Sequence, residues 1–438
     1  MLNNETDPAL FVCSCDEGFR SSCAGLGAFR SINDGTYCVL HFPEAKGEEF
    51  VSAVKAKLDA NNFDFSGVYF PESFSFFGQH FPSEPKFEGA VFASDVNFGE
   101  AIFDQGVNFS RALFKGDATF LKAELKGPAN FGSVEFHKRA VFNATQFFED
   151  ALFTFAVFNG ETDFQRASFG GLLTLDFVAV KDTLTFALIQ DYKKVQGFAA
   201  DGALWMSGAR IDRPENVSFQ SLSLRPGWFV NVDVRKFNFI EVDWKELSQA
   251  GFRYDIREDI AYLEKSSVEI PYRLLSITYR QLANNAEESH RYRQGSEFRY
   301  LSMDVLRREH PSFSAMLTLD WWYWLASGYG ELAGRAFLIL LLLIFVFGCA
   351  YLVVGFSRST DKRVDTTRST SVADPTGAGA PIRPVGAAFL YSSEVLTLQK
   401  PEPKPSTACA RILVTLETIL GPTQLALLAL AIRRKFMR

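Results

Sequence analysis

Four cysteines and one histidine near the N-terminus are the residues whose types could bind a metal ion. They lie in the stretch CSCDEGFRSSC…YCVLH, and they are Cys13, Cys15, Cys23, Cys38 and His41. Thiolates and imidazoles are the usual ligands of tetrahedral zinc sites. The C-x14-C-x2-H spacing that ends this stretch predicts a zinc site formed by Cys15, Cys23, Cys38 and His41. The alternative is a set of reduced, partly buried thiols.

No residue pattern typical of catalysis accompanies these cysteines. The five histidines are scattered, and the sequence has no GK[ST] phosphate-binding loop, HExxH motif or G-x-S-x-G motif. The net charge of −6 also differs from that of a general nucleic-acid-binding protein, which would be strongly basic. The sequence therefore favours a non-enzymatic protein with no cofactor apart from the predicted zinc ion.

The part of the chain that must position these residues contains phenylalanines at regular intervals. Between residues 65 and 186, 23 sites recur at alternating intervals of five and six residues, and 20 of them are Phe. From Ala90 to Ala167, the residue two positions before each site is Ala, Val or Thr. In an α-helix successive rings would point about 140° apart, so no single apolar stripe would form. Short strands separated by corners, as in a solenoid, fit this pattern better.

This repeat resembles that of the pentapeptide-repeat family, in which a small residue, a polar residue and Leu or Phe precede two variable residues. The units AVF, VNF, AIF, VNF, ALF and ATF at residues 90–120 carry the resemblance. It implies a mainly β fold, a right-handed quadrilateral β-helix with the large residues stacked along its axis. Every second unit here has one extra residue, so we expect 22-residue coils in which Phe87 lies between Phe65 and Phe109. At about 4.8 Å per coil, the regular part would span roughly 25 Å.

The segment before the repeats, residues 1–62, resembles the short segments ending in YC-x-x-H that precede such arrays. It begins without the basic and apolar regions of a secretory signal. Apolar residues share one face of a predicted helix over 48–62, which we expect to cap the first coil. The solenoid is predicted over 63–244, with irregular corners after residue 186.

Helical patterning follows the solenoid. Residues 245–315 predict a helical hairpin, which resembles one found in membrane-bound bacterial pentapeptide-repeat proteins. A nucleic-acid surface is the alternative for its aromatic and basic face. The next segment, 316–335, contains the cluster DWWYW, whose residue types are those found at the level of lipid headgroups.

Two apolar segments predict transmembrane helices. Residues 336–356 carry no charge over 21 residues, which is long enough to cross a bilayer. Residues 411–432 form a second candidate despite Glu417 and Pro422, which membrane helices tolerate where they face other helices or water. We expect the loop 357–410 to be extracytoplasmic, with a disordered centre. The basic tail 433–438 is expected in the cytosol.

The short apolar stretch at 387–399, between the two predicted spans, makes this region resemble the pore module of two-span potassium channels. KPEPKP follows where a T-x-G-Y-G filter would be expected, so a selective potassium pore is disfavoured. An assembly with a degenerate filter remains as an alternative function.

The favoured function is that of a scaffold in the cytoplasmic membrane, with both termini in the cytosol, which presents the solenoid to a protein partner. The missing signal and the cysteines, which suit a reducing compartment, support this orientation. Homo-oligomers are possible for either function. Residues between the rings, such as Glu88, Glu100, Asp104 and Arg111, are expected to carry the function. Mimicry of DNA by the mildly acidic solenoid is a third hypothesis.

Overall fold

The computed structural model describes residues 11–23, 25–188, 197–199, 202–244, 259–261, 263, 272–309, 318–354, 385–399, 404–405 and 407–436. Much of the predicted linker before residue 272 and the centre of the predicted loop 357–410 lie outside the described residues. The chain divides into two compact units, Met1–His290 and Arg291–Arg438. The two units are described separately below.

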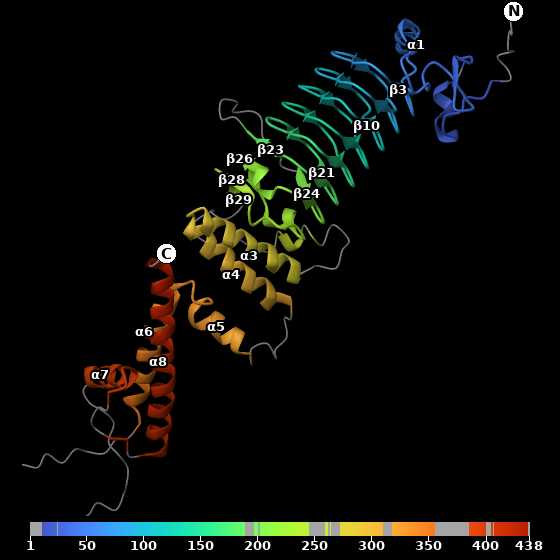
Figure 1. Cartoon of the computed structure of the whole chain (residues 1–438). Coiled ribbons are helices and arrows are strands. Elements are labelled where there is room, and N and C mark those ends of the chain that lie inside the picture. The colour runs from blue at the N-terminus through green and yellow to red at the C-terminus, as the bar shows by residue number, and fades with distance from the viewer. Residues whose placement is uncertain are drawn as a thin grey trace, which may run out of the picture. The chain divides into compact units, whose positions relative to one another are not determined.

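The first unit contains a parallel β-solenoid of about eight turns (Figure 1), built from short strands in four parallel sheets. The β3 sheet contains β3 (Tyr69–Phe70), β6 (Val91–Phe92), β10 (Leu113–Phe114), β14 (Glu135–Phe136), β18 (Val157–Phe158), β22 (Ala179–Val180) and β25 (Arg210–Ile211). The β4 sheet contains β4 (Phe74–Ser75), β7 (Val96–Asn97), β11 (Ala118–Thr119), β15 (Ala140–Val141), β19 (Thr162–Asp163), β23 (Leu184–Ala187), β26 (Val217–Gln220) and β28 (Asn238–Ile240).

The other two sheets have five strands each. The β5 sheet contains β5 (His80–Phe81), β8 (Ile102–Phe103), β12 (Glu124–Leu125), β16 (Gln146–Phe147) and β20 (Ser168–Phe169). The β9 sheet contains β9 (Val107–Asn108), β13 (Ala129–Asn130), β17 (Ala151–Leu152), β21 (Leu172–Thr174) and β24 (Ala203–Trp205). The last coil adds η2 (Pro214–Asn216), η3 (Pro226–Phe229) and a parallel pair, β27 (Ser223–Leu224) with β29 (Asp243–Trp244).

Neighbouring strands in the regular part of a sheet are 22 residues apart. Leu113, for example, pairs with Val91 on one side and with Glu135 on the other. This register confirms the predicted 22-residue coil. After residue 186 the interval changes, since Ala179 pairs with Arg210. The predicted irregularity of the later coils is therefore also confirmed.

The solenoid core consists of phenylalanine rings in two kinds of contact. Phe87 stacks on Phe65 and Phe109 at ring-centroid distances of 5.2 and 4.9 Å, as predicted. It also meets the ring of Phe98 edge to face, at 5.4 Å. Offset-stacked and edge-to-face contacts are the arrangements that aromatic quadrupoles favour. The preceding small residues, such as Ala90, are fully buried and leave room for the rings.

One corner in each half-coil has left-handed backbone. Positive φ angles recur every eleven residues, from Gly67, Gly78 and Gly89 through residues of every chemical type. The non-glycine members of this series are Glu100, Arg111, Lys122, Ser133, Ala144, Phe155, Arg166 and Phe177. A side chain in this conformation costs about 1–2 kcal/mol relative to the right-handed region. The tight coil therefore imposes backbone strain at its corners, since most of them carry a residue other than glycine.

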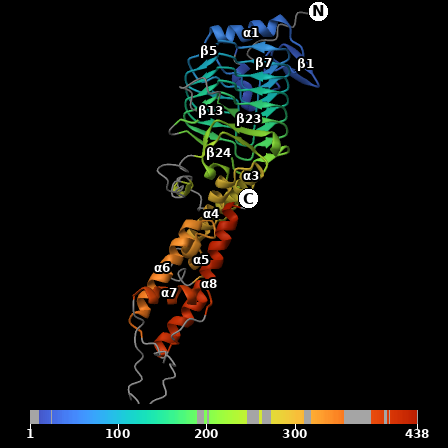
Figure 2. The same ribbon diagram turned by 90° about the vertical axis from the view of Figure 1, so that its left-hand side faces the viewer.

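Both ends of the solenoid are covered by other parts of the first unit. Helix α1 (Glu48–Asp59) lies across the first coil (Figure 2), where Phe50 contacts the ring of Phe70 at 5.4 Å. At the other end, α3 (Tyr272–Glu288) places the Asn285 side-chain amide 2.7 Å from the carbonyl oxygen of Phe237. These contacts cover the strand edges that would otherwise be open to pairing with another chain.

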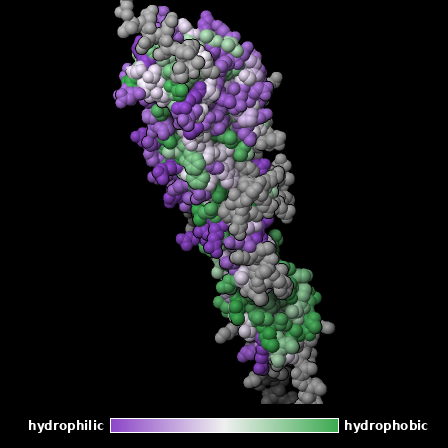
Figure 3. Space-filling view, turned by 90° about the vertical axis from the view of Figure 1, so that its right-hand side faces the viewer, coloured by the Kyte–Doolittle hydropathy of each residue, from purple (hydrophilic) through white to green (hydrophobic). Residues whose placement is uncertain are grey.

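The second unit consists of helices α4 (Tyr292–Glu309), α5 (Leu319–Ser327), α6 (Ala333–Tyr351), α7 (Val385–Leu396) and α8 (Ala408–Phe436). By length and composition, α6 and residues Ala408–Arg434 of α8 could each cross a membrane. Hydrophobic residues cover much of the surface of this helical part in Figure 3, whereas the solenoid surface is mainly hydrophilic. Helix α6 begins before the predicted span and includes Arg335, whose guanidinium lies 4.5 Å from the ring of Trp324.

Candidate metal centre

The N-terminal segment brings its cysteines together by pairing with a small hairpin. The hairpin consists of β1 (Arg30–Ile32) and β2 (Gly35–Tyr37). The backbone N–H of Ser14 donates to the carbonyl of Thr36 at 2.8 Å, which places the preceding and following cysteines beside the end of β2. The 3-10 helix η1 (Glu17–Cys23) then returns the chain to the same place, and Cys23 is its last residue. Cys38 follows β2 directly.

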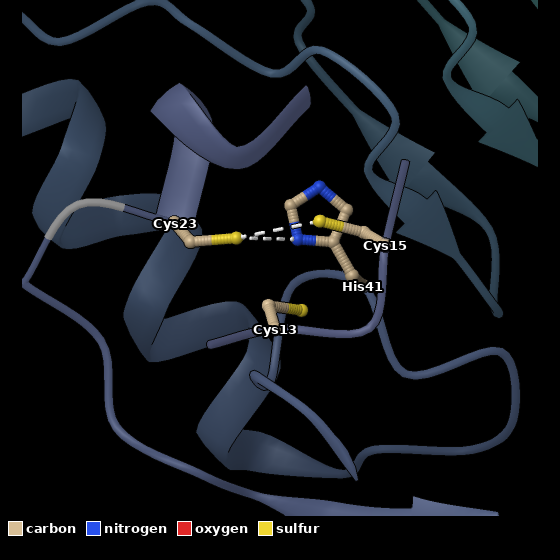
Figure 4. A group of neighbouring side chains, drawn as sticks. All are labelled: Cys13, Cys15, Cys23 and His41. Atoms are coloured by element: carbon tan, nitrogen blue, oxygen red, sulfur yellow. Dashed lines mark hydrogen bonds between the residues drawn. The ribbon is translucent and has the colours of Figure 1, made fainter. Parts of the chain in front are cut away.

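Five donor atoms converge in this cluster. The sulfurs of Cys13, Cys15 and Cys23 and a ring nitrogen of His41 all lie within 4.8 Å of one another (Figure 4). The Cys23 sulfur is 3.8 Å from that of Cys15 and 3.6 Å from that of Cys38. His41 Nδ1 lies 3.1 Å from both the Cys23 and the Cys38 sulfurs. None of the four cysteines in this cluster forms a disulfide bond.

The orientation of the His41 ring is fixed on the side away from the sulfurs. Its Nε2 lies 3.1 Å from the carbonyl oxygen of Ser66, which belongs to the first coil, and 3.1 Å from the Ser22 hydroxyl. In the neutral ring with its proton on Nε2, which donates to Ser66, Nδ1 directs its lone pair at the cysteine sulfurs. This is the arrangement in which metal-bound histidines are commonly held by a backbone carbonyl.

The electrostatics of the cluster favour one thiolate, at Cys13, because the pKa values of Cys15 and Cys23 are both raised. Hydrogen bonds from the thiols of Cys23 and Cys38 and from His41 lower the pKa of Cys13 far below its ordinary value. Burial and the neighbouring Cys13 sulfur raise the pKa of Cys15 to about 12. Burial alone would lower the pKa of His41, but its contacts with Cys13 and Cys38 outweigh burial and raise it to about 9. A thiolate is the form of cysteine that binds metals.

The donor set fits zinc in chemistry and in the spacing of its sulfurs, whereas His41 Nδ1 lies closer to two of them, at 3.1 Å, than in a zinc site. Tetrahedral zinc with ordinary bond lengths separates two sulfur ligands by about 3.8 Å and a sulfur from a nitrogen by about 3.5 Å. The observed separations of 3.6 and 3.8 Å between sulfurs fall close to this spacing. Cys13, Cys38 and His41 are buried. A closed set of this kind is typical of structural rather than catalytic zinc.

All four residues of the sequence-predicted site, Cys15, Cys23, Cys38 and His41, therefore contribute to one cluster. The prediction omitted Cys13, whose sulfur also accepts the backbone N–H of Cys38 at 3.3 Å. The C-x-C spacing could have indicated it, because residues two apart in an extended segment point to the same side. Zinc takes four ligands, so five donors leave one thiol outside the first coordination shell.

The cluster is tied to the solenoid by its surroundings. The ring of Phe19, in η1, lies over Gly67 and Gly89, where an added Cβ would come within 2.4 and 2.5 Å of ring carbons. The Ser21 hydroxyl donates to Asp64 at 2.8 Å. The Lys57 amine donates to the carbonyl of Ser22 at 3.1 Å. The N-terminal segment and the first coil therefore form one packed structure.

Comparison with known proteins supports the repeat assignment. Residues 76–124 match the family model described as pentapeptide repeats (9 copies). The coils at these residues are therefore similar to pentapeptide repeats. No curated protein and no solved structure matches the chain. The matched repeats lie in the first unit, between the N-terminal segment and α3.

Proposed function

We propose that this protein is a membrane-anchored scaffold whose pentapeptide-repeat solenoid, a right-handed quadrilateral β-helix, binds a protein partner through its side. The observation that carries the proposal is the exposed aromatic pair Phe155 and Phe177. These rings stack at 5.2 Å on the outside of the solenoid, with 58% and 56% of each residue exposed. The ends of the solenoid are covered by its own chain, so the side is the surface available to a partner.

The backbone under this pair strengthens the argument. Both residues have left-handed φ angles, 59° for Phe155 and 53° for Phe177. A bulky residue in that conformation is uncommon and strained. The rings are also not buried, so core packing does not explain them. Because the coil imposes left-handed backbone at this corner in every half-coil, the backbone holds both rings outside, and exposed aromatic surface of this kind is typical of a recognition site.

Three ion pairs on the side of the solenoid involve residues that were expected to contact a partner, which leaves the exposed rings as the more available contacts. Arg111 pairs with Glu88, Lys122 lies 3.2 Å from Glu100, and Lys126 lies 3.0 Å from Asp104. Each pair joins neighbouring coils. Three of the acidic residues expected to contact a partner thus have basic neighbours within the solenoid. Such exposed pairs contribute at most about 1 kcal/mol each.

The anchor of the proposed scaffold is the helical second unit. Helices α6 and α8 are apolar enough to cross a membrane as a hairpin. We place the solenoid and the C-terminus in the cytosol and the 357–410 loop outside the cytoplasmic membrane. The unbridged cysteines of the N-terminal segment, three of which are buried, suit this reducing compartment.

The test has two parts. Removing residues 311–438 should release the solenoid from membranes into the soluble fraction, whereas the full chain stays in the pellet after alkaline extraction. A double variant, Phe155→Asn with Phe177→Asn, should keep the fold, because Asn tolerates left-handed backbone, but lose the crosslinked partner. Phe77→Asn is the matched control, since Phe77 is equally exposed at 57% but lies at another position on the surface. Membrane retention of the shortened chain would contradict the anchor, and partner capture by the double variant would contradict the surface.

For the metal centre, we propose that zinc bound by four of the five donors closes the N-terminal end of the solenoid. The position of His41 between the sulfurs and the carbonyl of Ser66 supports this role, because metal binding would fix the segment to the first coil. A structural zinc of this kind stabilises folding directly. Metal analysis of the purified full chain should find one zinc ion per chain.

A second candidate function is a channel-like assembly. The observation that favours it is the packing of the short helix α7 between α6 and α8, in the order of a two-span pore module. Purified protein in planar bilayers tests it. Conductance together with a homo-oligomer would favour the channel, and a silent monomer would favour the scaffold.

A further inference from the structure

A buried carboxyl group lies where the three helices α6, α7 and α8 meet. Glu417, on α8, is fully buried. It accepts hydrogen bonds from the Tyr351 hydroxyl on α6 and from the Ser392 hydroxyl on α7. Both of these residues are also fully buried. Each of the three helices therefore contributes one polar group to a single junction.

The charge state of this carboxyl is constrained by its surroundings. Other titratable groups near it are Tyr391, whose ring contacts Tyr351 at 5.1 Å, and Glu394, both on α7. Among the residues that the structure describes, no basic side chain pairs with Glu417, and Arg411 of the same helix is exposed. An unpaired charge in an apolar bundle is costly, so such a group is expected to be neutralised.

The hydroxyl groups accommodate a proton on Glu417. The oxygen of Ser392 lies against Glu417 Oε1 and also 3.4 Å from the carbonyl oxygen of Ile344. One hydroxyl proton can serve only one of these acceptors. A protonated Glu417 would donate to Ser392, and Ser392 would then donate to Ile344. Tyr351 would still donate to the other carboxyl oxygen, so every group in the chain has a partner.

The same junction determines how closely α7 packs. Gly348 of α6 faces Phe389 of α7, where an added Cβ would come within 2.4 Å of the ring. Gly421 of α8 faces Leu396 of α7, where an added Cβ would come within 2.7 Å of the side chain. Small residues at such crossings let helices approach closely. A charge at Glu417 would therefore sit in a tightly packed apolar contact.

We propose that Glu417 is a proton-binding site and that its bound proton holds α7 between α6 and α8. This inference rests on the proposed membrane insertion of α6 and α8. Loss of the proton would leave a carboxylate among apolar helices and would loosen α7. The packing of α7 against α6 and α8 would then depend on pH through the carboxyl group of Glu417.

The experiment uses the full chain reconstituted in vesicles of phosphatidylcholine and phosphatidylglycerol. Alkaline extraction first shows whether the chain is inserted in the vesicles. A failure of membrane insertion is thereby distinguished from a failure of the proton-binding proposal. Infrared spectra at neutral pH should then show the carbonyl band of a protonated carboxyl group. The band should be lost in Glu417→Gln and kept in Glu394→Gln, the matched control on α7. Tyr351→Phe should shift the band to higher frequency, because the carbonyl loses a hydrogen bond.

Hydrogen exchange of the α7 amides reports the structural consequence. In the natural chain, protection corrected for intrinsic rates should fall at alkaline pH. It should not fall in Glu417→Gln, whose neutral amide resembles the protonated acid. An inserted protein without the carboxyl band at neutral pH would overturn the proposal. A carboxylate band that responds to sodium ions would also overturn it and would indicate a metal-cation site instead.

Discussion

The ring of Phe19 occupies the space that a Cβ atom on Gly89 would need. The nearest ring carbon lies 2.5 Å from that position. A residue of the N-terminal segment thus fits directly onto a corner of the second coil. This contact joins the candidate metal centre to the solenoid. Position 89 must therefore be glycine for the Phe19 ring to pack there.

The first prediction concerns this contact. Gly89→Ala should destabilise the docked N-terminal segment, because the new methyl group must displace the Phe19 ring in addition to adopting left-handed backbone. We expect a cost of about 1–3 kcal/mol from overpacking beyond the backbone term. Denaturant unfolding of the full chain measures the difference.

Gly78→Ala is the matched control for Gly89→Ala. Both glycines have a φ of 64°, but an added Cβ at Gly78 has no atom within 4 Å. The two variants therefore share the backbone cost of about 1–2 kcal/mol and differ in the Phe19 contact. Equal destabilisation by both substitutions would show that the contact with Phe19 contributes nothing.

The second prediction concerns the metal. Cys23→Ser and His41→Ala should each abolish zinc binding, since these two residues link the cluster: Cys23 contacts the sulfurs of Cys15 and Cys38, and His41 Nδ1 contacts those of Cys23 and Cys38. Of Cys13→Ser, Cys15→Ser and Cys38→Ser, one should keep one zinc ion per chain, because five donors exceed the four that zinc needs. Metal analysis of the purified variants decides this. Full zinc content in Cys23→Ser would contradict the site.

Removal of the metal gives the third prediction. A strong chelator should expose the N-terminal segment to proteolysis before it affects the solenoid, whose core has no metal contact. The expected effect is large, because structural zinc can contribute on the order of 10 kcal/mol to folding. Limited proteolysis with and without added zinc measures it. Identical digestion patterns under both conditions would count against a structural role.

The fourth prediction concerns the phenylalanine core. Phe98→Ala should cost about 3–5 kcal/mol, because it removes two stacked and three edge-to-face contacts and leaves a cavity. Phe98→Leu should cost less than about 1.5 kcal/mol, since it nearly conserves volume. The exposed Phe148 is the control, and its replacement by Ala should change stability by less than about 0.5 kcal/mol. Equal effects at both positions in thermal unfolding would contradict a filled core.

The fifth prediction is a pH dependence of the docked segment. Burial acts to raise the pKa of Asp64, but hydrogen bonds from Ser66 and Ser21 and the charge of Lys57 outweigh it and lower the pKa. Because the folded-state pKa is depressed, its stabilising contribution is complete above the unfolded value of about 3.9. The contribution is lost as the pH falls through the folded-state pKa. Asp64→Asn should flatten this acid dependence in thermal unfolding, and an unchanged slope would contradict the assignment.

The solenoid was predictable from the sequence because its core is periodic. Each buried ring, such as Phe87, must lie above a ring 22 residues away, so one interval determines the coil and its stacking. The left-handed corners were not predictable in the same way. Phe155 and Phe177 occupy them although neither residue type favours that backbone, and their exposure follows from the coil rather than from local preference.

The metal centre was only partly predictable, for a different reason. Cys38 and His41 are close in sequence, so their spacing alone indicated a shared site. The C-x-C spacing places Cys13 on the same side of the chain as Cys15, but it does not show that Ser14 pairs with the hairpin and so brings both cysteines to the cluster. The same holds for Asn285, which reaches the last coil from a distant helix.

Photocrosslinking in intact membranes tests the central claim, that the solenoid side at Phe155 binds a partner while the chain is anchored. A photoreactive phenylalanine is placed at position 155, or at position 148 as an exposed control, and oligomeric state is read from the same sample. The proposed function predicts a crosslink to another protein from position 155 and none from position 148. Crosslinks from position 155 only to a second copy of this chain, or equal products from both positions, would contradict it.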